Sequence, residues 1–205
     1  MAYRDFKMKD LKAKFGIQEI GTQLFDRSKI QKIEPSDKLK SDLADAEFIT
    51  LSTEKAVSEQ LVSPILVEIA KLNRFLQVFS GEIITANKSL GLNGEIDFIF
   101  ARKPWTRKPQ NPLLCVTESK LGLINSGVDQ ATAQMLGLRV FNQNNGYDDL
   151  IIHGATTDGK SWRFLRLEGT SLFIDESEYS SLELPFLLGV LQEIVNFYKP
   201  STPSV

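Results

Sequence analysis

Two carboxylates and a lysine lie in two short apolar stretches in the middle of the chain. Asp97 falls within residues 95–101, and Glu118 and Lys120 close residues 113–120. Alternate side chains of a strand point to the same face, so Glu118 and Lys120 share a face if this stretch is extended. If the two strands are neighbours, Asp97 joins them, and two carboxylates then share a small patch with one ammonium group.

Two carboxylates at close range disfavour each other's ionisation unless a cation accompanies them. Mg²⁺ is suited to this position, because it prefers oxygen ligands and usually takes one or two carboxylates with waters and phosphate oxygens. Such an ion can polarise a phosphoryl group and help to generate hydroxide from bound water. Lys120 would stabilise the charge developing on the phosphoryl oxygens, or position the attacking water. The pattern therefore predicts chemistry on a phosphoryl group.

The elements that must position these residues follow from hydrophobic spacing and turn signals. Strands are predicted over residues 75–86, 95–101, 113–120, 150–155, 161–167 and 171–174. Helices are predicted over 52–72 with an interruption at Pro64, from Ser126 with Asp129 as its capping-box partner to Asn144, and over 185–198. In the second strand, Ile96, Phe98 and Phe100 are expected on one face, opposite Asp97. This order predicts an α/β domain whose mixed sheet is covered by helices.

Length and composition fit one globular domain. The 205 residues, 42% apolar and 24% charged, suffice for one full hydrophobic core. Residues 1–50 are rich in Lys and Asp, and we interpret them as an N-terminal extension packed on a single α/β domain over 51–205. The formal net charge is −2, so any contact with DNA must come from a local patch.

The chain has one cysteine, Cys115, and one histidine, His153. This excludes an intrachain disulfide and metal sites made of several cysteines or histidines, and His153 is expected to be structural. No apolar run approaches the length of about 18 residues that a membrane-spanning helix needs, and no secretory signal is visible. These features favour a reducing cytoplasm.

Gly94-Glu95-Ile96-Asp97 is followed by a loop and then by an apolar stretch that ends in Glu118-Ser119-Lys120. This order resembles the D…ExK core of the PD-(D/E)XK nucleases, which include restriction endonucleases and the nuclease domains of type I restriction subunits. Residues 154–164 also resemble the strand–turn–strand of those domains. The resemblance covers roughly residues 53–175, and the residue before Asp97 is Ile96 rather than the family's proline.

The resemblance implies a restriction-endonuclease-like mixed β-sheet flanked by helices. It implies that Asp97 and Glu118 bind Mg²⁺ or Mn²⁺, that the backbone carbonyl of Ser119 completes the ligand set, and that Lys120 is the catalytic lysine. It further implies a DNA substrate and action as a homodimer or beside a partner subunit.

A glutamate on the helix before the strands is also implied, as a further metal ligand. Glu59 borders the apolar face and is the first candidate, with Glu68 as the second; the alternative for Glu59 is a surface pair with Lys55. On the later helix, Gln130 and Gln134 lie one turn apart, on a face well away from its apolar stripe. They could contact phosphate or orient a catalytic side chain, and ordinary surface glutamines are the alternative.

The loop between the two site strands combines four cations with one indole: Arg102, Lys103, Trp105, Arg107 and Lys108. Cations suit phosphates and an indole suits base stacking, so DNA contacts are expected there. The alternative is a solvated hairpin tip. Because the loop joins the two site strands, it is expected near one end of the site.

Three functions follow from these features. The first is a Mg²⁺-dependent DNA endonuclease, and the second is a non-catalytic member of the same fold that binds DNA or a protein. The third is a structural module in which Glu118 and Lys120 form a solvated pair of little energetic value. The intact set of Asp97, Glu118 and Lys120 favours the enzyme.

Overall fold

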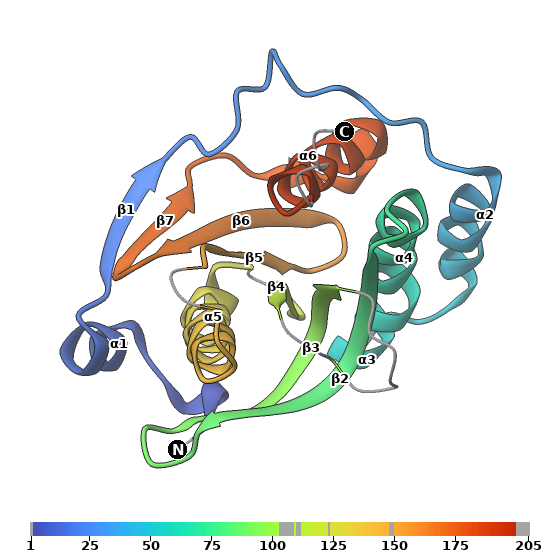
Figure 1. Cartoon of the computed structure of the whole chain (residues 1–205). Coiled ribbons are helices and arrows are strands. Elements are labelled where there is room, and N and C mark those ends of the chain that lie inside the picture. The colour runs from blue at the N-terminus through green and yellow to red at the C-terminus, as the bar shows by residue number, and fades with distance from the viewer. Residues whose placement is uncertain (1, 103–108, 110–111, 123, 148–149, 200–205) are drawn as a thin grey trace.

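A twisted mixed sheet forms the centre of the protein (Figure 1). The computed structural model describes residues 2–102, 109, 112–122, 124–147 and 150–199. Within them the sheet has eight strands: seven lie in the order β1-β7-β6-β5-β4-β3-β2, and the short β8 pairs with β6 outside that order. The pairs β1–β7 and β4–β5 are parallel, and the others are antiparallel. The expected mixed α/β architecture is thus confirmed.

The strands are β1 (Gln18–Thr22), β2 (Leu76–Asn87), β3 (Leu92–Arg102), β4 (Leu113–Ser119), β5 (Ile152–Thr157), β6 (Ser161–Glu168), β7 (Ser171–Asp175) and β8 (Tyr179–Ser180). The predicted adjacency of the two site strands is confirmed, since β3 and β4 are antiparallel neighbours with Phe98 opposite Thr117. The β4 strand then runs parallel to β5, with Glu118 opposite Thr156.

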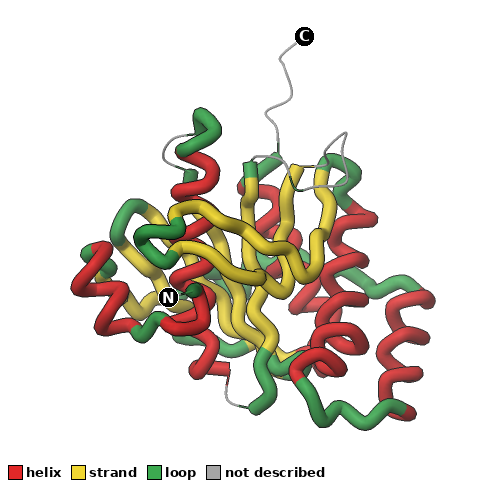
Figure 2. Tube along the Cα trace, turned by 90° about the horizontal axis from the view of Figure 1, so that it is seen from below, coloured by secondary structure: helices red, strands yellow, loops and turns green. Residues whose placement is uncertain are grey.

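Helices cover both faces of the sheet (Figure 2). The helical elements are η1 (Tyr3–Asp5), α1 (Met8–Phe15), α2 (Asp37–Asp45), η2 (Ala46–Phe48), α3 (Glu54–Val57), η3 (Ser58–Val62), α4 (Ser63–Leu72), η4 (Ile124–Gly127), α5 (Val128–Gln143), η5 (Ser181–Glu183) and α6 (Leu184–Phe197). Side chains of α2, α4 and α6 pack on one face around Trp162. Those of η1, α1 and α5 pack on the other around Ile99. No helix in the described part of the chain has the length and apolar character to cross a membrane.

One predicted strand face is wrong. Phe98 and Phe100 share the core with α4 and α6, but Ile96 is buried in the opposite core with Ile99. The paired positions of β2 and β3 run from Ser80–Phe98 directly to Glu82–Ile96, leaving out Gly81 and Asp97. Gly81 has a φ of 69°, so the backbone departs from regular extended geometry opposite Asp97.

The first fifty residues supply both sheet and core. β1 adds a parallel strand beside β7, and the Ser36 hydroxyl caps α2 by accepting from the Leu39 amide at 3.2 Å. Tyr3 is buried under α5, and its hydroxyl donates to the Ile84 carbonyl at 3.1 Å. The segment therefore covers the helix that faces the site strands.

The first helix continues past Pro64 through a wide turn. Thr53 caps α3 by accepting from the Ala56 amide at 3.1 Å, and residues 58–62 form a π-helical turn before α4. Pro64 lies in the first turn of α4, where its missing N–H is tolerated. The predicted capping box of α5 is wrong: a 3-10 turn precedes the helix, which begins at Val128 without a side-chain cap.

Candidate active site

The middle of β3 and the end of β4 bring the predicted triad together. The Ser119 amide donates to Asp97 Oδ2 at 2.8 Å, which ties the aspartate to the neighbouring strand. Lys120 Nζ lies 2.8 Å from Glu118 Oε1, and the Lys120 amide donates to the Thr157 carbonyl at 2.7 Å. Pairing with β5 therefore fixes the backbone of Glu118 and Ser119, and the hydrogen bond from Ser119 places Asp97 beside them.

Both predicted glutamines reach this cluster from α5. Gln134 Nε2 donates to Glu118 Oε2 at 2.6 Å, and Lys120 Nζ donates to Gln130 Oε1 at 3.1 Å. Gln134 is fully buried, so the interpretation as a surface glutamine is wrong for this residue. Its amide orients one oxygen of Glu118 while Lys120 engages the other.

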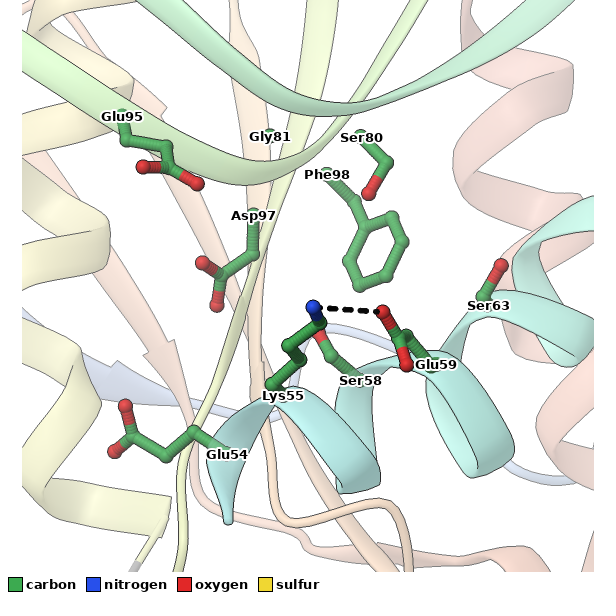
Figure 3. A pocket seen from close by; sticks show the side chains of 10 residues that line it. All are labelled: Glu54, Lys55, Ser58, Glu59, Ser63, Ser80, Gly81, Glu95, Asp97 and Phe98. Carbon is green, nitrogen blue, oxygen red and sulfur yellow. Dashed lines mark ion pairs between the residues drawn. The ribbon is translucent and has the colours of Figure 1, made fainter.

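The helix glutamate nearest the triad is Glu54, which the sequence analysis did not single out. Glu54 Oε1 lies 3.8 Å from Lys120 Nζ. Glu59 pairs with Lys55 at 3.7 Å, as its surface alternative describes, although both line a cavity beside Asp97 (Figure 3). Glu68 is buried elsewhere and accepts from the amide and hydroxyl of Ser36.

The position of Glu54 follows from a contact that Ser58 makes one helical turn further along the chain. Ser58 stands four residues after Glu54, and its hydroxyl donates to Ser119 Oγ at 3.1 Å. Residues four apart share a helix face, so the contact that anchors Ser58 on β4 also turns Glu54 towards the triad. The small side chains of Ser58 and Ser119 let the helix approach the strand closely.

Arg102 is the one residue of the cationic set that the structure describes. Arg102 closes β3 and is exposed, five residues beyond Asp97. At about 3.3 Å per strand residue, this places its backbone roughly 17 Å from Asp97. The expectation that the loop lies near the site is therefore not met at Arg102. Lys103, Trp105, Arg107 and Lys108 lie outside the described residues.

Two adjoining cavities, of about 460 and 670 Å³, lie beside the triad. Both are lined by Glu54, Glu95 and Asp97, so they are two halves of what we call the site groove. Figure 3 shows Asp97 and Glu95 descending from β3 into the first half, with the α3 side chains below. Glu118 and Lys120 line the second half.

Burial dominates the electrostatics of the triad. The pKa of Glu118 is raised to about 7, first because its side chain is buried and then because the charge of Asp97 is close; hydrogen bonds from Lys120 and Gln134 oppose this rise. Burial also raises the pKa of Asp97, against the hydrogen bond from the Ser119 amide. Burial alone would lower the pKa of Lys120, but the hydrogen bond to Glu118 and its charge keep that pKa above the ordinary value.

The donor set of the groove suits a hard divalent cation. Among the described residues, no group of three or more His, Cys, Asp or Glu side chains is arranged to hold a metal on its own. Mg²⁺ usually takes only one or two carboxylates and fills its other positions with water and phosphate oxygens, which matches Asp97 and Glu118. Four carboxylates line the larger half of the groove against only two cations, Arg4 and Lys120. A divalent ion would offset this excess.

His153 takes no part in the site. It is buried, its Nδ1 lies 2.6 Å from the Tyr198 hydroxyl, and burial with the nearby charge of Arg166 lowers its pKa to about 4. The structural role expected for it agrees with these contacts.

No model of a protein family and no curated protein matches this chain. Its function is therefore inferred from the contacts among the described residues.

Proposed function

We propose that this chain is a Mg²⁺- or Mn²⁺-dependent nuclease that hydrolyses phosphodiester bonds in DNA. The observation that carries the proposal is the convergence of Asp97, Glu118 and Lys120 on one groove, with Gln134 bonded to Glu118. A buried carboxylate pair beside a lysine is costly to maintain for stability alone. Burial and perturbed pKa values of this kind are typical of functional sites.

Asp97 and Glu118 would hold the ion, which when bound would polarise a phosphoryl oxygen and lower the pKa of a water ligand. Gln134 fixes the orientation of the Glu118 carboxylate, so that the carboxylate is positioned before substrate arrives. Lys120, held by Gln130 and the strand end, would place its positive charge beside the phosphoryl oxygens as negative charge develops there.

The order of elements supports the finer fold assignment. A helix precedes the meander of β2, β3 and β4, and α5 then leads into β5 and β6. This is the order that the resemblance to restriction-endonuclease-like domains implies. On the same resemblance, we propose action on DNA as a homodimer or beside a partner subunit, and the single cysteine favours a cytoplasmic location.

Cleavage by a Lys120→Ala variant tests the proposal. The unchanged protein should cut DNA with Mg²⁺ or Mn²⁺, and Lys120→Ala should lower the rate roughly 10²–10³-fold, by analogy with loss of one oxyanion donor. Metal binding should persist, since an ammonium group is not a ligand. Lys71→Ala, which removes an exposed lysine near the end of α4, is the matched control and should cut normally.

Two outcomes would contradict the enzyme. Lys120→Ala that cuts as fast as the unchanged protein would assign the activity elsewhere. An unchanged protein that binds metal and DNA but leaves duplex, single-stranded and nicked DNA intact would favour the non-catalytic alternative, in which the same groove only binds.

A further inference from the structure

The N-terminal segment closes one end of the site groove. Ala2, Tyr3 and Arg4 line its larger half together with the triad. In Figure 1 the N-terminus lies beside the β2–β3 hairpin, next to α5. Sequence patterning assigned this segment to an extension outside the site, so it brings side chains that the D…ExK motif does not include.

Tyr3 fixes this segment in place. It is 1% exposed, and a Cβ atom added at Gly137 of α5 would lie 2.1 Å from its hydroxyl. On its other side, a Cβ at Gly94 of β3 would lie 3.3 Å from the ring. Because Tyr3 is wedged between α5 and β3, the residue that follows it has a defined position at the groove.

In this half of the groove, Arg4 and Ile83 are much more exposed than Lys120. The Arg4 side chain is 83% exposed, with Nε 4.0 Å from Asp5 Oδ1. Ile83, on β2, is 73% exposed although it is a large apolar residue in a strand. Lys120, by contrast, already contacts Glu118, and its side chain is 16% exposed. Arg4 therefore offers a cation to an incoming ligand without breaking a buried pair.

We propose that Arg4 and Ile83 form a subsite for the nucleotide next to the phosphate that Lys120 engages. This inference rests on the proposed function and names the part of the groove that receives the flanking strand. The guanidinium fork of Arg4 suits two oxygens of one phosphate. Ile83 supplies an apolar surface for the adjoining sugar or base, as apolar side chains do when they contact nucleic acid.

The charge of the groove explains why a subsite is needed. Asp97 and Glu118 are assigned to the ion, but Glu54 and Glu95 also line this half and would still repel the DNA strand beside the phosphate that Lys120 engages. Arg4 places a positive charge beyond the carboxylates, at the point where the strand leaves them. It acts on binding rather than on the bond that breaks.

Cleavage and binding measured on the full chain test this subsite. Arg4→Gln and Ile83→Ser should each raise KM for a short DNA substrate, about tenfold for Arg4→Gln, with kcat little changed. Arg4→Gln should also reduce the salt dependence of DNA binding by about one phosphate contact. Arg74→Gln repeats the arginine change and Leu72→Ser removes a comparable exposed aliphatic side chain, both near the other end of β2, and both variants should behave as the unchanged protein.

The outcomes separate the subsite from the proposed function. If the unchanged protein cuts and Lys120→Ala does not, but Arg4→Gln and Ile83→Ser keep the normal KM and salt slope, the subsite is wrong and the function stands. A fall in kcat at constant KM would also overturn the subsite. If the unchanged protein neither binds nor cuts DNA with Mg²⁺, Mn²⁺ or Ca²⁺, both are wrong.

Discussion

Replacing Glu118 with glutamine should change how stability depends on pH. The carboxyl pKa of Glu118 is raised from 4.5 to about 7, because its side chain is buried and Asp97 lies close. A carboxyl group with a raised pKa contributes fully to stability below pH 4.5, and this contribution is lost as pH rises through 7. Glutamine keeps the size and one oxygen acceptor but cannot ionise.

The magnitude follows from the size of the rise. At about 1.36 kcal/mol per pKa unit, a rise from 4.5 to about 7 corresponds to a loss of about 3 kcal/mol between pH 4 and 8. His153 works in the opposite direction, since a lowered pKa destabilises the fold as pH falls from 6.5 towards 4. The dependence of unfolding free energy on pH is therefore flattened in the unchanged protein. The contribution of the Glu118 carboxyl is obtained from the difference between this curve and that of Glu118→Gln.

Urea unfolding at several pH values between 4 and 8, with chelator present, measures this difference. Relative to the unchanged protein, Glu118→Gln should gain about 2–3 kcal/mol in unfolding free energy as pH rises across this range. Glu193→Gln makes the same change at an exposed position on α6 and should give no such trend. If the curves of Glu118→Gln and the unchanged protein run parallel, burial does not raise the pKa of this carboxyl.

Two further predictions concern the metal and the N-terminal wedge. Mg²⁺ at about 100 times its Kd should stabilise the unchanged protein by about 2.7 kcal/mol, seen as a rise in the thermal midpoint. Asp97→Ala should abolish that rise and Asp45→Ala should keep it; an equal rise in Asp97→Ala would remove Asp97 from the ligand set. Gly137→Ala should lower the unfolding free energy by about 1–3 kcal/mol in urea, because its methyl group overlaps Tyr3. Unchanged stability would show that Tyr3 is not wedged there.

The site strands were predictable because their signals are local. Alternation places Glu118 and Lys120 on one face, and a loop too short for a crossover helix makes antiparallel neighbours of the two strands. The face of Ile96 was not predictable by the same rule. Gly81, on the neighbouring strand, interrupts the pairing opposite Asp97. Alternation within residues 95–101 alone gives no sign of this interruption, because its cause lies on the partner strand.

The role of the first fifty residues depends on contacts between distant parts of the chain. β1 is a short, mostly exposed strand without apolar alternation, so its sequence gives no strand signal. It forms because β7, about 150 residues later, offers a parallel edge. Likewise, Tyr3 is an ordinary aromatic in the sequence and is buried only because Gly137 leaves room for it. Such pairings appear only once both partners are folded.

Helical geometry explains why Glu54, and not the predicted Glu59, is the helix glutamate that lies within 4 Å of Lys120. Counting back from Val62 and Leu66 with the α-helical period places Glu59 at the edge of the apolar face. Residues 58–62 form a π-helical turn, which holds an extra residue and shifts the phase of every position across it. Counting forward from the Thr53 cap reaches Ser58 at the start of that turn, so Glu54 and Ser58, the residue that contacts β4, are still in phase. Turns of this kind occur frequently at functional sites. Where a proline such as Pro64 interrupts a predicted helix, the residues that share a face are therefore better assigned by counting from the N-terminal cap.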